Sequence, residues 1–136
     1  MFRTGGGALP VLFNELDEEV VGWYKNSAGL KKPIYVKNVL GGGLKNNGKL
    51  VVSLGNDLSI EYVLNVYGIA WNGQRGVTSS TVKPIPFVQA NAGILVEVVG
   101  LDSTSPSVNV ITTVDYTFLT GCSITIYYTK KTDDFE

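Results

Sequence analysis

The residue types that carry out most enzyme chemistry are scarce in this chain. It has no histidine and a single cysteine, Cys122, among its 136 residues. Without histidine, the chain lacks the commonest general base, the commonest metal ligand and every Ser/His or Cys/His arrangement. A lone cysteine forms no internal disulfide. Its setting in the strand-like GCSITIYYT favours a small buried hydrophobe over a reactive thiol.

Paired carboxylates, as in glycoside hydrolysis, are the catalytic chemistry that this composition still allows. The candidates are Glu61, Glu97, Asp102 and Asp115. Nothing in their spacing selects a pair, and each has an ordinary explanation as a strand-edge or loop charge. The glycine triplets at 5–7 and 41–43 lack the context of a P-loop or a dinucleotide fingerprint. We therefore predict that the chain is not an enzyme and uses no cofactor or metal.

The aromatic side chains are the one hint of a binding function. Trp and Tyr rings stack on sugars and are enriched at subunit interfaces, although in strands they more often fill the core. The set consists of Trp23, Tyr24, Tyr35, Tyr62, Tyr67 and Trp71. The loop NGQRG follows Trp71 directly, so we expect that ring to be partly exposed. Trp71 and Tyr67 are the candidates for surface recognition.

Charge and hydropathy limit the partners. The 11 basic and 12 acidic residues give a net charge of −1 and are scattered, whereas nucleic-acid binding needs clustered Lys and Arg. Charged residues make up 17% of the chain, against about 25% in typical domains. A small domain this poor in charge exposes apolar area or buries it against copies of itself. We expect self-association. No apolar run reaches the roughly 18 residues of a membrane span, so no membrane insertion is expected.

Short β segments alternate with turn signals along the rest of the chain. The period-2 patterns and β-branched residues predict about seven or eight strands of an antiparallel β-sandwich, jelly-roll-like in type. Pro84 and Pro86 make 82–90 an edge strand or an extended connection. The charged tail after residue 129 is expected to fray. The predicted strands are 20–24, 34–40, 50–54, 60–71, 82–90, 94–101, 108–113 and 123–129.

The segment ILVEVVGL at 94–101 is apolar on both faces apart from Glu97. Such strands are usually buried on both sides, here by the core on one face and by a neighbouring subunit on the other. The predicted subunit interface therefore contains Val96 and Val98, or their opposite-face neighbours Leu95 and Val99.

Residues 1–12 are expected to form an extended N-terminal arm ahead of a single β domain at 13–136. Three consecutive glycines and Pro10 disfavour a regular element there, yet the segment also carries apolar side chains. A flexible segment with apolar anchors can become ordered on a partner. We therefore predict that the arm attaches the domain to another protein; packing of the arm along its own oligomer is the open alternative. The anchors are Phe2, Leu9, Val11 and Leu12.

Three segments together resemble a domain found in many virion proteins of tailed bacteriophages, often at the ends of tail fibres, baseplate appendages or head fibres. They are EEVVGWYKNSAGLKKPIYVKNV (18–39), LNVYGIAWNGQ (64–74) followed by PIPF (84–87), and SITIYYTKKTD (123–133). Their order and spacing carry the likeness, which spans roughly residues 14 to 134. The resemblance implies a β-sandwich, a homotrimer and no catalytic residues.

We thus expect a structural protein of a phage virion, a homotrimeric fibre or capsid appendage. Its arm would attach it to another phage structural protein of the capsid, portal or tail. The single domain behind a short arm favours a small appendage or capsid-attached protein over a tail-tip receptor-binding protein. The alternative is a carbohydrate-binding module that recognises a glycan of the host cell surface.

Overall fold

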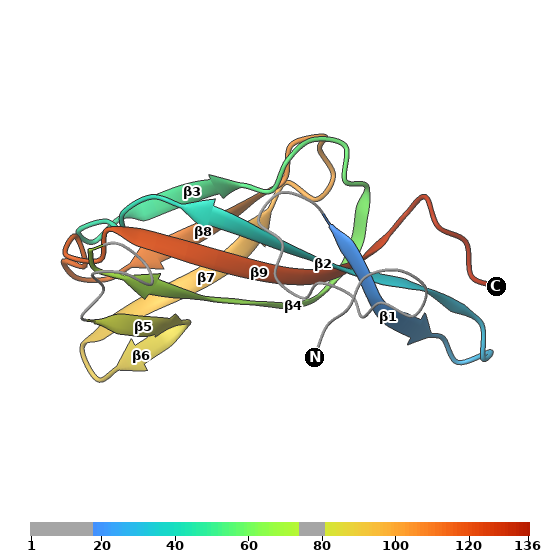
Figure 1. Cartoon of the computed structure of the whole chain (residues 1–136), viewed down its shortest axis with the longest axis horizontal. Coiled ribbons are helices and arrows are strands. Elements are labelled where there is room, and N and C mark those ends of the chain that lie inside the picture. Colours follow the sequence, from blue (N-terminus) through green and yellow to red (C-terminus); the bar gives the residue numbers. More distant parts are fainter. Residues whose placement is uncertain (1–17, 74–80) are drawn as a thin grey trace, which may run out of the picture.

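Nine β-strands and no helix make up the part of the chain that the structure describes. The computed structural model describes residues 18–73 and 81–136, which form a two-layer β-sandwich (Figure 1). The predicted all-β antiparallel sandwich is therefore confirmed. The predicted arm lies outside the described residues. The strands are β1 (Glu19–Lys25), β2 (Lys31–Gly41), β3 (Lys49–Ser53), β4 (Ile60–Trp71), β5 (Val82–Ile85), β6 (Phe87–Gln89), β7 (Ala92–Val99), β8 (Ser107–Thr112) and β9 (Gly121–Lys130).

The strands form a five-stranded sheet in the order β1-β2-β9-β4-β5 and a four-stranded sheet in the order β3-β8-β7-β6. All pairs are antiparallel. The chain crosses from one sheet to the other between β2 and β3 and again between β8 and β9. These two segments run side by side, so β2 pairs with β9 in one sheet and β3 pairs with β8 in the other.

The proline-containing segment lies at the edges of both sheets. β5 is the outermost strand of the five-stranded sheet, and β6 is the outermost strand of the four-stranded sheet. The chain passes from one sheet to the other at Pro86, after a cis Ile85–Pro86 peptide bond. Because proline cannot donate to a ladder, an edge position suits this segment. The prediction of an edge strand or extended connection is confirmed.

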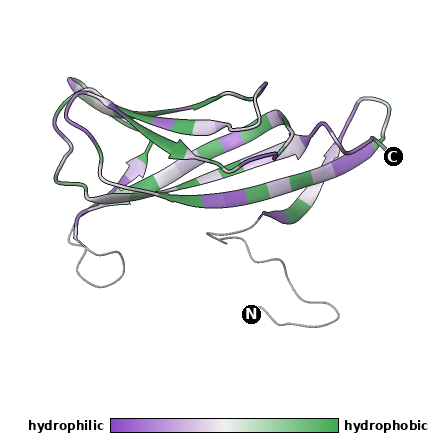
Figure 2. Ribbon diagram, turned by 90° about the horizontal axis from the view of Figure 1, so that it is seen from above, coloured by the Kyte–Doolittle hydropathy of each residue, from purple (hydrophilic) through white to green (hydrophobic). Residues whose placement is uncertain are grey.

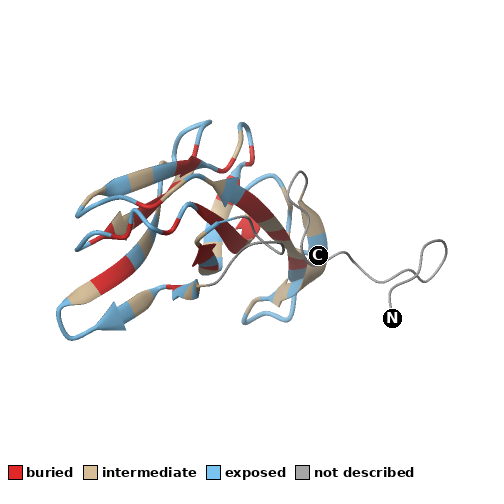
Figure 3. Cartoon of the chain, turned by 60° about the vertical axis from the view of Figure 1, so that its left-hand side comes forward, coloured by how far each residue is buried: buried red, intermediate tan, exposed pale blue. Residues whose placement is uncertain are grey.

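Alternating side chains of both sheets build the core between the layers. Figure 2 shows hydrophobic and hydrophilic bands alternating along the strands, and Figure 3 shows the buried residues within the strands of both layers. In the central strand β9 the inward side chains include Cys122, which is fully buried as predicted. The core cluster contains Val39, Leu44, Val52, Leu54, Leu58, Ile60, Ala70, Ile85, Ile94, Val108, Val110, Tyr116, Leu119, Cys122, Ile124, Ile126 and Tyr128.

Strand β7 is buried on one face only within the chain. Val96 and Val98 pack against the core cluster, so they are not available to a neighbouring subunit. Leu95 and Val99 point the other way and are 41% and 36% exposed. Of the two alternatives predicted for a subunit interface, strand alternation therefore leaves Leu95 and Val99 on the outer face, because it directs Val96 and Val98 inward.

The C-terminal tail is folded back, and the prediction that it frays is wrong. Lys31 and Glu136 exchange two backbone hydrogen bonds of 3.0 and 2.9 Å. The Phe135 ring packs beside Tyr24, with 6.2 Å between ring centroids. Asp133 accepts a 2.7 Å hydrogen bond from the Tyr35 hydroxyl. The charged composition of the tail concealed these specific partners on the β1–β2 hairpin.

Candidate recognition surface

The four candidate carboxylates lie on separate elements with local roles. Glu61 on β4 pairs with Lys32, and Glu97 on β7 accepts a 2.9 Å hydrogen bond from the Asn109 amide. Asp115 accepts hydrogen bonds from Thr117, which lower the pKa of its carboxyl. Asp102 is exposed in the turn after β7. No hydrogen bond joins any two of these carboxylates, and within residues 18–73 and 81–136 no group of acidic or cysteine side chains forms a metal site.

The predicted aromatic set does not form one platform. Most of its members belong to stacked pairs with ring centroids about 6 Å apart, which is typical of favourable ring packing. Trp23 is 61% exposed near the end of β1, away from the core. The set is therefore dispersed over the sandwich. The stacked pairs are Tyr24–Tyr62, Tyr35–Tyr128 and Tyr67–Tyr127.

Trp71 is a packing residue, and the expectation that it is partly exposed is wrong. Its side chain is only 8% exposed. The indole ring lies over Gly121, where an added Cβ would be 2.8 Å from ring atoms. The cross-strand partner of Trp71 is this glycine, and the absent side chain leaves room for the ring. Trp71 therefore does not offer its ring to a ligand, and Tyr67 is the remaining predicted recognition residue.

Tyr67 lies in a shallow depression on the outer face of the five-stranded sheet. Its ring stacks on Tyr127 of β9, with centroids 6.2 Å apart and planes inclined by 26°. The two hydroxyl oxygens are 3.4 Å apart. The hydrogen bond to Tyr127, together with burial, raises the pKa of Tyr67 to about 12. The depression has a volume of about 330 Å³ and is lined by Ile34, Leu64, Asn65, Tyr67 and Tyr127.

A β-bulge in β4 shapes one wall of this depression. Val63 opposes Tyr128 and Asn65 opposes Tyr127, two consecutive residues of β9, so Leu64 is an extra residue in β4. A bulge re-aims the side chains beside it. Leu64 and Asn65 consequently both line the depression, while Val63 packs against the core. Strict alternation along 60–71 would have placed Val63 beside Asn65 on the outer face.

A buried polar network lies next to the depression on the same face. Asn38 of β2 donates a 2.8 Å hydrogen bond to Thr125 and accepts a 2.9 Å hydrogen bond from Ser123, both on β9. All three side chains are buried. Thr125 is also the cross-strand partner of Tyr67. Fully paired buried groups hold their strands in fixed register, so this network stabilises the sheet beneath Tyr67.

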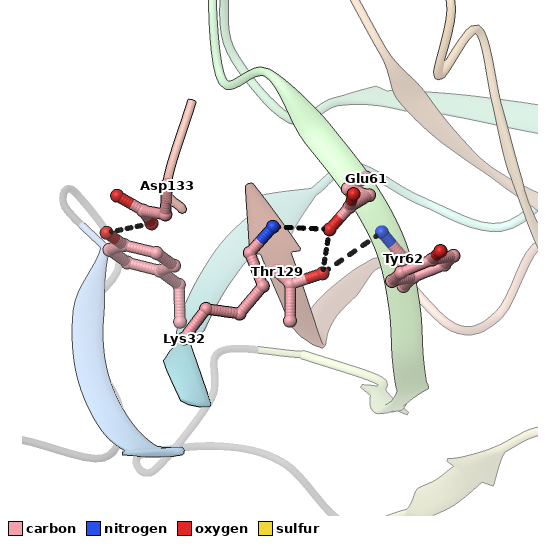
Figure 4. A network of polar contacts seen from close by, with 6 residues as sticks. Lys32, Glu61, Tyr62, Thr129 and Asp133 are labelled. Atoms are coloured by element: carbon pink, nitrogen blue, oxygen red, sulfur yellow. Dashed lines mark hydrogen bonds and ion pairs between the residues drawn. The ribbon is translucent and has the colours of Figure 1, made fainter. Parts of the chain in front are cut away.

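A second polar cluster joins three strands at the other end of this sheet (Figure 4). Lys32 is 2% exposed, and its ammonium donates a 2.6 Å hydrogen bond to Glu61. Thr129 donates to the same carboxylate oxygen at 3.3 Å and accepts a hydrogen bond from the Tyr62 backbone N–H. The Lys32 ammonium also lies 4.9 Å from the centre of the Phe135 ring. These side chains interact with one another, and we assign the cluster a structural role.

A further hollow of about 350 Å³ lies between the β1–β2 hairpin and the folded-back tail. Its walls combine the exposed Trp23 ring with carboxylate groups. Sequence reasoning missed it because the tail was expected to fray. The lining residues are Trp23, Lys31, Pro33, Asp133, Asp134 and Glu136.

Comparisons with protein-family models, with curated proteins and with solved structures find no match for this chain. The resemblance to phage virion proteins therefore stays a prediction. Among the described residues, no helix is long and apolar enough to cross a membrane.

Proposed function

We propose that this protein is a structural component of a tailed-phage virion, a homotrimeric fibre or capsid appendage. The observation that supports assembly best is the outer apolar face of the four-stranded sheet. We define this face by its outward apolar side chains, which are Val51, Val88, Leu95, Val99 and Ile111. All except the half-buried Ile111 are exposed in the single chain.

The outer apolar face is spread over all four strands of its sheet, with polar side chains between its apolar ones. In the strand register, Leu95 lies beside Ile111, and Val51 lies beside Asn109. Glu97 is in the same row as Asn109, and its carboxylate is hydrogen-bonded to the Asn109 amide. One oxygen of this carboxylate therefore already accepts a hydrogen bond within the chain, while its negative charge stays without an ionic partner among the described residues. Burial of such a face against copies of the chain removes apolar area from water.

The protein composition of purified virions tests this function directly. We expect mass spectrometry of virions from the phage that encodes this chain to detect it at a stoichiometry that is a multiple of three. Its absence from particles that contain the other structural proteins would overturn the proposal.

The N-terminal arm is proposed to make the attachment to the capsid, portal or tail. Its apolar side chains Phe2, Leu9, Val11 and Leu12 support this role. Deletion of residues 1–12 should leave the oligomer and its melting temperature nearly unchanged but abolish incorporation into particles. Normal uptake of the truncated protein by particles would show that the arm is not the anchor.

Recognition of a glycan on the host surface is the second candidate function. The depression at Tyr67 and Tyr127, whose described lining is uncharged, favours it, because half-buried aromatic rings beside an exposed amide are suited to sugars. A glycan array probed with the purified protein tests this candidate, and the absence of binding to any glycan would remove it.

A further inference from the structure

The lining of the Tyr67–Tyr127 depression selects the chemistry of its ligand. Two aromatic rings, two aliphatic side chains and one amide form its walls, and none of the five residues is charged. Carboxylates line the hollow beside Trp23, in contrast. A ligand that matches an uncharged wall of this composition is neutral, with an apolar face and hydrogen-bonding groups at its edge.

The polar groups of the depression keep unused hydrogen-bonding capacity. Two tyrosine hydroxyls that share one hydrogen bond use a single donor, so within residues 18–73 and 81–136 the second O–H and the remaining lone pairs have no further partner. The Asn65 side chain is exposed and makes no hydrogen bond to another described residue. Its amide can therefore donate and accept at once, as recognition of adjacent hydroxyl groups requires.

The depression is held in shape before any ligand arrives. The stacked rings come from adjacent, paired strands, and the hydrogen-bonded Asn38, Ser123 and Thr125 lie beside them. The bulge at Leu64 fixes the position of Asn65 relative to Tyr127. A preformed wall on rigid strands lowers the ordering cost of binding.

We propose that this depression binds one pyranose ring of a neutral sugar, with the ring face against Tyr127 and Tyr67 and its hydroxyls hydrogen-bonded to Asn65. This inference rests on the second candidate function, glycan recognition, and names its site and ligand class. A pyranose has the required apolar face and hydroxyl edge, and the volume of about 330 Å³ suits a small ligand. Acidic sugars are disfavoured because none of the five described lining residues is a cation.

The proposed site is compatible with assembly through the outer apolar face. Tyr67 and Tyr127 point outward from the five-stranded sheet, whereas Leu95 and Val99 point outward from the four-stranded sheet. The two surfaces lie on opposite sides of the sandwich. A trimer built through one leaves the other open to solvent.

The test measures affinity of the full chain for neutral and acidic oligosaccharides, first on an array and then by calorimetric titration with the tightest neutral sugar. We expect Tyr127→Ala to weaken binding at least tenfold and Asn65→Ala to weaken it severalfold. Tyr62→Ala is the matched control, because Tyr62 is an exposed tyrosine of the same strand outside the depression. It should bind like the unchanged chain. If Tyr127→Ala does not fold, Asn65→Ala still gives the answer.

The outcomes separate failure of the site from failure of the function. Binding of a neutral sugar that both variants leave unchanged would overturn the site while glycan recognition stands. Binding of acidic glycans alone would overturn the ligand class. No binding to any glycan would overturn both this inference and the second candidate function. The proposed role as a structural virion component would be unaffected by that result.

Discussion

Several tyrosine hydroxyls of this protein serve as buried or half-buried hydrogen-bonding groups. Burial, and then the hydrogen bond to Asp133, raise the pKa of Tyr35 to about 12. The hydrogen bond to Tyr127, together with burial, raises the pKa of Tyr67 to about 12. Burial and the carboxylate of Glu18, which accepts from the Tyr128 hydroxyl, raise the pKa of Tyr128 far above its ordinary value. In the folded chain these hydroxyls therefore retain their protons at pH values where free tyrosine ionises.

The raised tyrosine pKa values predict a loss of stability at high pH. An unfolded tyrosine has a pKa of about 10, so the unfolded chain releases protons first. The stabilisation is fully present below about pH 10 and is lost as the pH rises toward about 12. Urea unfolding at a series of pH values should show this decline, and the decline should be smaller in a Tyr35→Phe, Tyr67→Phe variant. Equal declines in the variant and the unchanged chain would contradict the assignment.

The Lys32–Glu61 pair makes a second prediction for single residues. Because Lys32 is almost fully buried, Glu61→Gln leaves its charge without an ionic partner. We expect a loss of about 3 kcal/mol in the free energy of unfolding, as for other broken buried pairs. Asp102→Asn is the control, since this exposed turn residue should change stability by less than about 0.5 kcal/mol. Similar effects of the two substitutions in urea unfolding would show that the pair is not stabilising.

Among the elements, strands with undisturbed alternation were predictable from sequence. In 123–129 the period-2 pattern correctly separated Ile124, Ile126 and Tyr128 from the outward side chains of β9. In 60–71 the same pattern failed at Val63. The extra residue Leu64 is defined by pairing with β9, and that pairing depends on residues about half the chain away. Local periodicity contains no signal for it.

The candidate site was predictable only in part for the same reason. Tyr67 was among the predicted recognition residues, but its partner Tyr127 was seen only as one member of an alternating strand. Their juxtaposition follows from the insertion of β9 between β2 and β4, which no local pattern specifies. The exposure of Trp71 was mispredicted because the space over Gly121 is visible only once the strands are paired.

The folded-back tail makes a prediction at the scale of elements. Phe135→Ala removes the ring beside Tyr24 and over Lys32. We expect it to cost about 1–2 kcal/mol, since the ring is half-buried and makes both an aromatic and a cation–π contact. Amide exchange at Lys31, whose N–H donates to Glu136, should accelerate in the same variant.

Asp134→Ala provides the control for the tail, because Asp134 is exposed and lies next to Phe135. It should leave both stability and exchange at Lys31 nearly unchanged. An unprotected Lys31 amide in the unchanged chain would show that the tail is not docked in solution.

At the scale of the whole molecule, both outer faces of the sandwich carry exposed apolar side chains, among them Leu95 and Val99 on one face and Leu40 and Ile69 on the other. The four-stranded sheet presents the outer apolar face, and the five-stranded sheet presents a paired polar network beside a tyrosine depression. We propose that the first of these faces serves assembly and the second serves recognition in this chain, of which only 17% is charged. The low charge predicted that apolar area would be available, but only the strand register shows that Leu95 and Val99, rather than Val96 and Val98, supply it.

The central claim is assembly through the outer apolar face, and light scattering of the purified protein at micromolar concentration tests it most directly. The account predicts a mass three times the 14.6 kDa of the chain. Leu95→Glu should convert the trimer to a folded monomer, because a charge without a partner would be buried in the interface and would oppose association. Val82→Glu, at an exposed valine of the other sheet, should remain trimeric. A single-chain mass for the unchanged protein, or a trimer that Leu95→Glu leaves intact, would contradict the account.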